Sequence, residues 1–123
     1  MSHADAVRSY WEAADKRDWD AFEALLADDV VYRIPQTGEQ ITGKRHYVRF
    51  NIEYPGDWRI GVERVIAEGS EAASWISSTV GSDSQGAVTF FRFDAAGLIC
   101  DVTDFWPEPY DRPDRPEGVL DVP

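Results

Sequence analysis

The chain has 123 residues, 43% of them hydrophobic and 13% aromatic, which is long and apolar enough to bury one domain core. Its 12 lysines and arginines face 23 aspartates and glutamates, and the net charge of −11 excludes nucleic acid as a partner because phosphates would be repelled. No apolar run approaches the ~20 residues of a membrane span and no signal-peptide pattern opens the chain, so we expect a soluble, cytoplasmic protein without a membrane partner.

Helical signals open the chain. Ser2 with Asp5 three residues later predicts a helix start. The apolar positions that follow at helical spacing are Ala6, Val7, Tyr10, Trp11 and Ala14. Asp18 can cap a second, shorter helix. The apolar stripe of this second helix consists of Trp19, Phe22, Leu25 and Leu26.

A strand and a third helix complete the first half. Residues 30–34 predict a strand that stops at Pro35, and residues 36–41 predict a polar loop. Thr42 can cap the third helix, which Pro55 closes. The inner stripe of this helix consists of Tyr47, Phe50, Asn51 and Tyr54.

From Trp58 onward the hydrophobic period changes to two. Four strands are expected, at residues 58–66, 72–80, 87–93 and 98–106. The connecting turns are short and rich in Gly, Ser and Asp, which predicts antiparallel hairpins. Prolines at 107, 109, 113 and 116 then forbid regular structure, so residues 107–123 are expected to form an extended arm.

Helices followed by an antiparallel meander indicate the α+β class. A single curved sheet has more surface than three helices can cover. We therefore expect a cone: a curved antiparallel sheet, three helices across its concave face, and a cavity at the open end.

Three strings carry a family resemblance: VRSYWEAADKRDWDAFEALLADDVVY at 7–32, ITGKRHYVRF at 41–50 and FFRFDAAGLICDVTDFWPEP at 90–109. They resemble the nuclear transport factor 2-like superfamily, and within it the SnoaL-like polyketide cyclases and ketosteroid isomerases. The match covers nearly the whole chain apart from the last dozen residues. It implies one SnoaL-like domain over residues 1–123 with the roll-like cone fold. Function must still be argued from the site, because this fold hosts many activities.

The ketosteroid isomerase resemblance fails at most of that enzyme's proton-transfer positions. The tyrosine of the first helix is kept as Tyr10. However, Ile34 stands where the family has its base, and Thr89 where it has a protonated acid. The supporting tyrosine of the third helix would be Asn51. An isomerase of that mechanism is therefore rejected.

Asp104 is the main catalytic candidate. Side chains alternate along a strand, so one face of the last strand should contain Cys100, Val102, Asp104 and Trp106. SnoaL-like cyclases use a late-strand aspartate as acid/base, so the resemblance points to Asp104. On the inward face its neighbours would be Val102 and Trp106, with Thr89 and Phe91 one strand over. Burial there should raise the pKa of the carboxyl, as a general acid/base requires.

Two tyrosines are the candidate partners. Tyr10 from the first helix and Tyr32 from the first strand could offer hydroxyls to the same site. The alternative is that Asp104 is a structural carboxylate, bonded to the helix tyrosine or to loop amides, and that Tyr10 is a core aromatic.

The remaining candidates would bind substrate. Trp11, Trp58 and Trp106 could form an aromatic wall for a flat ligand, or could simply fill the cone. Ile34 shares the inward parity of Tyr32, and Asn51 interrupts an aromatic stripe.

No metal or cofactor is expected. The chain has two histidines and a single cysteine, without ligand spacing, and no cofactor motif. Trp75, Phe90 and Phe105 have outward parity, and such an apolar outer face predicts a homodimer through the sheet.

Three functions remain open. The first is a cofactor-independent acid/base enzyme (cyclase, isomerase or dehydratase) on a hydrophobic, carbonyl-bearing small molecule. The second is a binding protein without chemistry. The third is an epoxide-opening hydrolase, which needs a second inward carboxylate and an inward arginine; Arg64 is the strand arginine whose parity could suit.

Overall fold

The computed structural model describes residues 1–121 and shows three helices and six strands within them. The helices are α1 (His3–Lys16), α2 (Trp19–Ala24) and α3 (Lys44–Ile52). The strands are β1 (Leu26–Ile34), β2 (Glu39–Thr42), β3 (Arg59–Glu68), β4 (Glu71–Val80), β5 (Asp83–Phe93) and β6 (Ile99–Phe105). The expected α+β class is confirmed.

The first two helix starts are capped as predicted. The Ser2 hydroxyl accepts from the Asp5 amide, and the Asp5 carboxylate accepts in return from the Ser2 amide. Asp18 caps α2 through the Ala21 amide. The predicted cap of α3 is wrong: Thr42 ends β2, and Gly43 is the N-cap without a side-chain bond.

One mixed sheet contains the six described strands, in the order β2-β1-β6-β5-β4-β3. The meander from β3 to β6 is antiparallel, as expected, but β1 pairs with β6 in parallel. The predicted polar loop at residues 36–41 is also partly wrong, because β2 pairs with β1 there. The turn between them needs the positive φ of 76° that Gly38 adopts.

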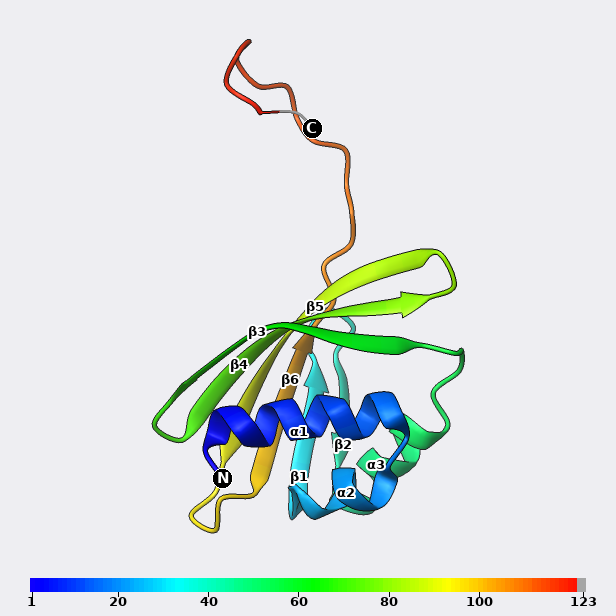
Figure 1. Ribbon diagram of the computed structural model, residues 1–123, viewed down its shortest axis with the longest axis vertical. Coiled ribbons are helices and arrows are strands. Elements are labelled where there is room, and N and C mark those ends of the chain that lie inside the picture. Colours follow the sequence, from blue (N-terminus) through cyan, green and yellow to red (C-terminus); the bar gives the residue numbers. More distant parts are fainter. Residues whose placement is uncertain (122–123) are drawn as a thin grey trace.

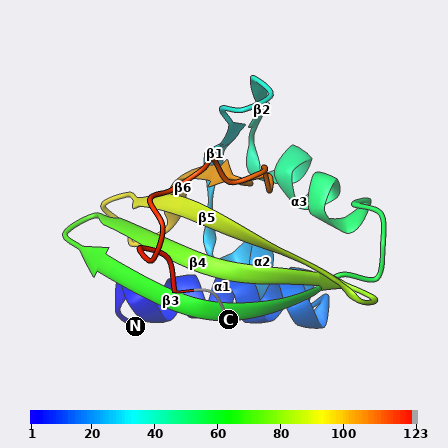
Figure 2. The same cartoon turned by 90° about the horizontal axis from the view of Figure 1, so that it is seen from above.

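The sheet is curved and does not close, and the helices cover one of its faces (Figures 1 and 2). α1 packs mainly on β3 and β4, whereas α3 packs on β1 and β2. Beyond β6 the described part of the arm has no strand and extends away from the body in Figure 1.

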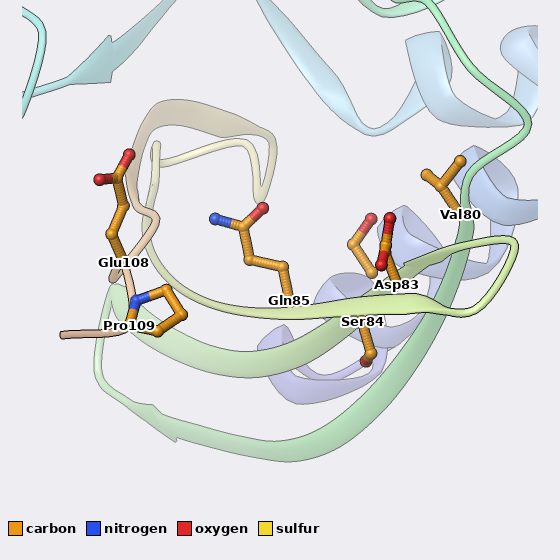
Figure 3. A pocket seen from close by; sticks show the side chains of 7 residues that line it. Val80, Asp83, Ser84, Gln85, Glu108 and Pro109 are labelled. Atoms are coloured by element: carbon orange, nitrogen blue, oxygen red, sulfur yellow. The ribbon is translucent and has the colours of Figure 1, made fainter. Parts of the chain in front are cut away.

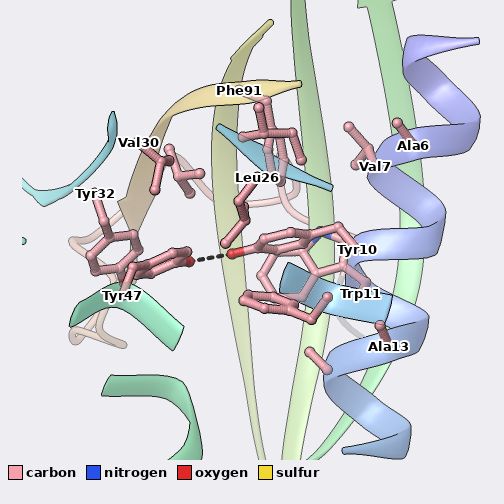
Figure 4. Packing of buried hydrophobic residues seen from close by; sticks show 14 of the residues in the cluster. Ala6, Val7, Tyr10, Trp11, Ala13, Leu26, Val30, Tyr32, Tyr47 and Phe91 are labelled. Carbon is pink, nitrogen blue, oxygen red and sulfur yellow. Dashed lines mark hydrogen bonds between the residues drawn. The ribbon is translucent and has the colours of Figure 1, made fainter. Parts of the chain in front are cut away.

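The core lies between the helices and the inner face of the sheet (Figure 4). Tyr10 and Tyr47 are almost completely buried there, and Phe22 contacts both rings. The inner wall is rich in aromatic rings, and its buried polar atoms come from these phenols and from Ser74, Thr89 and Asp104.

Along β6 the predicted alternation holds from Val102 to Phe105: Val102 and Asp104 are buried and Phe105 is exposed. It fails at Cys100, which is half-buried, because the register with β5 shifts at this end and Ile99 is buried instead.

Within residues 1–121, no helix combines the length and the apolar character that a membrane crossing would need.

Candidate functional site

A cavity of about 410 Å³ opens between the helices and the inner face of the sheet. Most of the predicted site residues line it: Tyr10, Trp11, Tyr32, Ile34, Asn51, Trp58, Asp104 and Trp106. Thr89, Phe91 and Val102 do not. They are fully buried behind the wall, so their expected direct contact with a ligand is not what the structure shows.

Asp104 is 5% exposed and is held by two hydroxyl donors. The Tyr32 hydroxyl donates to Oδ2, and the Thr89 hydroxyl donates to Oδ1 over 2.6 Å. Strand register explains both contacts: Thr89 stands directly opposite Asp104 on β5, and Tyr32 stands opposite Val102 on β1. Thr89 therefore supports the carboxylate from behind the cavity wall.

Burial raises the pKa of the Asp104 carboxyl, because the charged form loses its hydration. The hydrogen bonds from the Thr89 and Tyr32 hydroxyls oppose this effect without reversing it. The carboxyl therefore keeps its proton to a higher pH than an ordinary aspartate does.

The second polar group is a pair of phenols. The Tyr10 and Tyr47 hydroxyls are hydrogen-bonded to each other across the cavity wall (Figure 4). Burial raises the pKa of both phenols, and the nearby Asp104 charge adds to the effect. Both tyrosines are protonated at neutral pH, and because one hydroxyl donates to the other, the pair keeps one hydroxyl proton to donate elsewhere.

Tyr47 was not among the predicted site residues. The position that supports Tyr10 from the third helix was assigned to Asn51, and this assignment is wrong, since Tyr47 makes the contact. The Asn51 amide instead donates to the Tyr47 carbonyl oxygen over 2.9 Å, one helical turn earlier. The signal was present in the sequence: Tyr47 lies on the same inner stripe of α3 as Asn51.

Three tryptophans contribute to the aromatic lining of the cavity. The Trp11 indole donates to the Ser74 hydroxyl over 2.9 Å, which ties α1 to β4. The guanidinium of Arg17 lies over the Trp58 ring, with its Cζ 3.5 Å from the ring centroid. Trp106 is fixed through its backbone by the Gln36 side chain, at 2.6 and 3.1 Å. The three predicted tryptophans therefore line the cavity, and each is individually anchored.

A second hollow of about 450 Å³ adjoins the cavity (Figure 3). The two share the lining residues Ser78, Val80, Gln85 and Glu108. In Figure 3 the Gln85 side chain lies between Glu108 of the arm and the end of the β4–β5 hairpin. The inner cavity thus continues into a more polar surface hollow.

Across the described part of the chain, no group of three or more His, Cys, Asp or Glu side chains is placed to hold a metal ion. Arg64 is exposed beside a register shift in β3 and does not line the cavity. The arginine that epoxide opening would need is therefore not supplied by the predicted residue.

Sequence comparison agrees with this geometry. The model of the SnoaL-like domain matches residues 7–102. The chain belongs to the SnoaL-like domain family.

Solved structures place this SnoaL-like chain in the nuclear transport factor 2-like fold. A proposed ketosteroid isomerase from Kribbella flavida DSM 17836 is 43% identical, with a TM-score of 0.93 over 98% of this chain and 90% of that one. An NTF-2 like protein from Burkholderia xenovorans LB400 is 24% identical, with a TM-score of 0.84 over 98% and 94%. RV0760c from Mycobacterium tuberculosis, in complex with estradiol-17beta-hemisuccinate, is 23% identical, with a TM-score of 0.73 over 87% and 95%. No curated protein sequence matches the chain.

In this SnoaL-like protein the buried Asp104 carboxyl and the Tyr10–Tyr47 pair line the same cavity. A carboxylate can accept a proton from carbon, and a buried phenol can donate to an oxygen that gains charge.

Proposed function

We propose that this SnoaL-like protein is a cofactor-independent acid/base enzyme whose substrate is a hydrophobic, carbonyl-bearing small molecule. The observation that carries the proposal is Asp104: a buried carboxyl with a raised pKa, exposed to the cavity and held by two hydroxyls. Structural carboxylates are commonly held by cations or several amides, which lower the pKa instead. Residues with perturbed pKa values are enriched at catalytic sites.

In the proposed reaction, the Asp104 carboxylate removes a proton from the carbon next to the substrate carbonyl. The electrons of the C–H bond move into an enolate, and the Tyr10–Tyr47 pair donates a hydrogen bond to its oxygen. The proton on Asp104 then returns to another substrate atom. Cyclisation, isomerisation and dehydration all begin with this step, and we propose a reaction of that group.

The substrate class follows from the size and lining of the cavity. About 410 Å³ lies in the range of sites for drug-sized ligands, and aromatic rings make up much of the wall. The 43% identical relative is a proposed ketosteroid isomerase, and RV0760c was crystallised with a steroid ester. We therefore propose a flat polycyclic ligand. Since Ile34 occupies the place of the isomerase base, the proton transfer would depend on Asp104 instead.

Hydrogen–deuterium exchange next to a carbonyl tests the proposal without knowledge of the full reaction. Estrone and the smaller 1-tetralone would be incubated with the protein in D₂O, and deuterium uptake followed by mass spectrometry. We expect the protein to accelerate exchange of at least one ketone. Asp104→Asn should lower this accelerated exchange rate about 10²-fold or more.

Asp101→Asn is the matched control, because Asp101 lies on the same strand but pairs with Arg33 away from the cavity. It should exchange like the wild type. If Asp104→Asn binds and exchanges these ketones as fast as the wild type, the proposed role of Asp104 is wrong.

A binding protein without chemistry is the alternative that one observation favours. Within residues 1–121, every fully buried side-chain nitrogen or oxygen already has a hydrogen-bond partner, so the site is stable without a reacting group. Tight ketone binding with no exchange above the buffer rate would favour this alternative. An epoxide-opening hydrolase is weaker, because the cavity lining in the described part of the chain includes no arginine.

A further inference from the structure

Arg17 has a backbone conformation that is unusual for its residue type. It follows the last residue of α1 with φ of 60° and ψ of 29°, in the left-handed region that glycine normally occupies. A non-glycine residue is strained there and persists when surrounding contacts hold it.

The side chain of Arg17 supplies those contacts. Its Nη1 donates to the carbonyl oxygens of Ala14 and Asp15, at 3.1 and 3.0 Å. Its Nη2 donates to the Trp58 carbonyl oxygen at 2.6 Å, and the guanidinium carbon lies 3.5 Å from the centroid of the Trp58 ring. One side chain thus holds both the backbone and the indole of Trp58.

Trp58 lines the cavity just before β3, where the chain returns from α3. The next two residues are held from the same end of α1: Asp15 accepts two hydrogen bonds from Arg59 and one from the Ile60 amide. The last turn of α1 therefore fixes the whole segment that brings Trp58 to the cavity.

We propose that Arg17 is a positioning residue for the ligand: it holds Trp58 as a rigid wall of the cavity and so sets the affinity for flat apolar rings. The inference rests on the proposed use of the cavity as a ligand site. An indole that is already ordered loses less rotational freedom when a ring packs against it, so a ligand binds more tightly. Arg17 itself is not in the lining, so it would act on a ligand through Trp58.

The variant Arg17→Gly separates positioning from stability. Glycine accepts the left-handed conformation without strain, so the fold should keep its melting temperature approximately. The contacts to Trp58 are lost at the same time. Lys16→Gln is the matched control, because it removes one positive charge from the neighbouring residue, whose partner Glu12 lies on the exposed side of α1.

Binding of radiolabelled estrone would be measured by equilibrium dialysis. We expect Arg17→Gly to weaken binding about 10-fold and Lys16→Gln to leave it unchanged. In a Trp58→Leu background, adding Arg17→Gly should have little further effect, because the positioned side chain is already gone. Equal affinities of Arg17→Gly and wild type would overturn the proposal.

A ligand-free readout keeps the inference testable if estrone does not bind. The ¹⁵N relaxation of the Trp58 indole N–H should show a rigid side chain in the wild type and in Lys16→Gln, and a mobile one in Arg17→Gly. An indole that stays equally rigid in Arg17→Gly contradicts the positioning role. Absence of ligand binding with the predicted change in mobility contradicts the proposed function and leaves the positioning role standing.

Discussion

At the scale of the residue, the site depends on how one carboxyl is surrounded. Asp104 is buried and held by uncharged donors, and burial raises its pKa. Asp15 is the opposite case: hydrogen bonds from Arg59 and from the Ile60 amide lower its pKa to about 2, against a smaller desolvation effect. The two aspartates should therefore respond to pH and to neutralisation with opposite signs.

We predict that Asp104→Asn raises the stability at pH 7. A raised pKa means that the folded state binds more protons than the unfolded chain between the two pKa values, so stability falls as pH rises through the folded pKa. Asparagine cannot ionise, so the Asp104→Asn variant does not lose this stability as the pH rises. The expected result is a higher melting temperature for Asp104→Asn than for the wild type at pH 7.

The advantage of Asp104→Asn should grow as the pH is raised from 3.8 through the folded-state pKa, because the buried wild-type carboxyl must ionise over this interval. Thermal melts of both proteins at several pH values would measure it. An asparagine variant that melts lower throughout would identify Asp104 as a stabilising structural carboxylate, and the catalytic proposal would be dropped.

At the scale of the element, features that depend on local sequence could be predicted, whereas pairings between distant segments could not. The Ser2 cap, the Asp18 cap and the inward parity of Asp104 are local and were predicted correctly. β2 is a short polar edge strand, and its sequence shows no hydrophobic alternation that would distinguish it from a loop. The parallel contact between β1 and β6 joins distant segments, so no local pattern could indicate it.

The same limit applies to the site. Parity showed which residues face inward, but it could not show which hydroxyl reaches which partner. Tyr47 belongs to a helical stripe that the sequence predicts, yet its bond to Tyr10 depends on where α1 and α3 each pack on the sheet. The donation from Thr89 to Asp104 likewise depends on strand register.

We predict that Asp15→Asn destabilises the protein at pH 7, by about 1 kcal/mol, because it weakens the link between α1 and β3. A lowered pKa gives stability that is present above the unfolded value and lost as pH falls toward about 2. The difference between variant and wild type in urea unfolding should therefore shrink from pH 5 to pH 2. A constant difference over this range would contradict the ion-pair explanation.

At the scale of the whole molecule, the outer face of the sheet carries an exposed apolar patch. Ile66, Trp75, Phe90 and Phe105 are exposed by 56, 52, 50 and 36%. Register places them in two adjacent rows across β3 to β6, and the Phe90 and Phe105 rings meet edge to face at 6.1 Å. Apolar area of this kind on one face favours self-association. We propose that residues 1–123 form one domain that pairs through this face.

We predict a homodimer at micromolar concentration, and a shift toward monomer when Phe90→Lys places a charge in the proposed interface. Sedimentation velocity would measure both. Ile52→Lys is the matched control, because Ile52 is equally exposed at the end of α3 and away from the outer sheet face. A wild-type monomer, or equal dissociation by both substitutions, would contradict the proposed interface.

The pKa of Asp104 tests the central claim most directly. Carbon-13 NMR of the aspartate side-chain carboxyl groups would be followed from pH 2 to pH 9, with Asp104→Asn used to assign the signal. We predict a titration midpoint above the ordinary value of 3.8, because burial outweighs the hydroxyl donors. The midpoint should rise further in Tyr32→Phe, which removes one donor to the carboxylate. A midpoint at or below 3.8 would show that the hydrogen bonds dominate, and that Asp104 is a fixed structural anion rather than the proton carrier of the site.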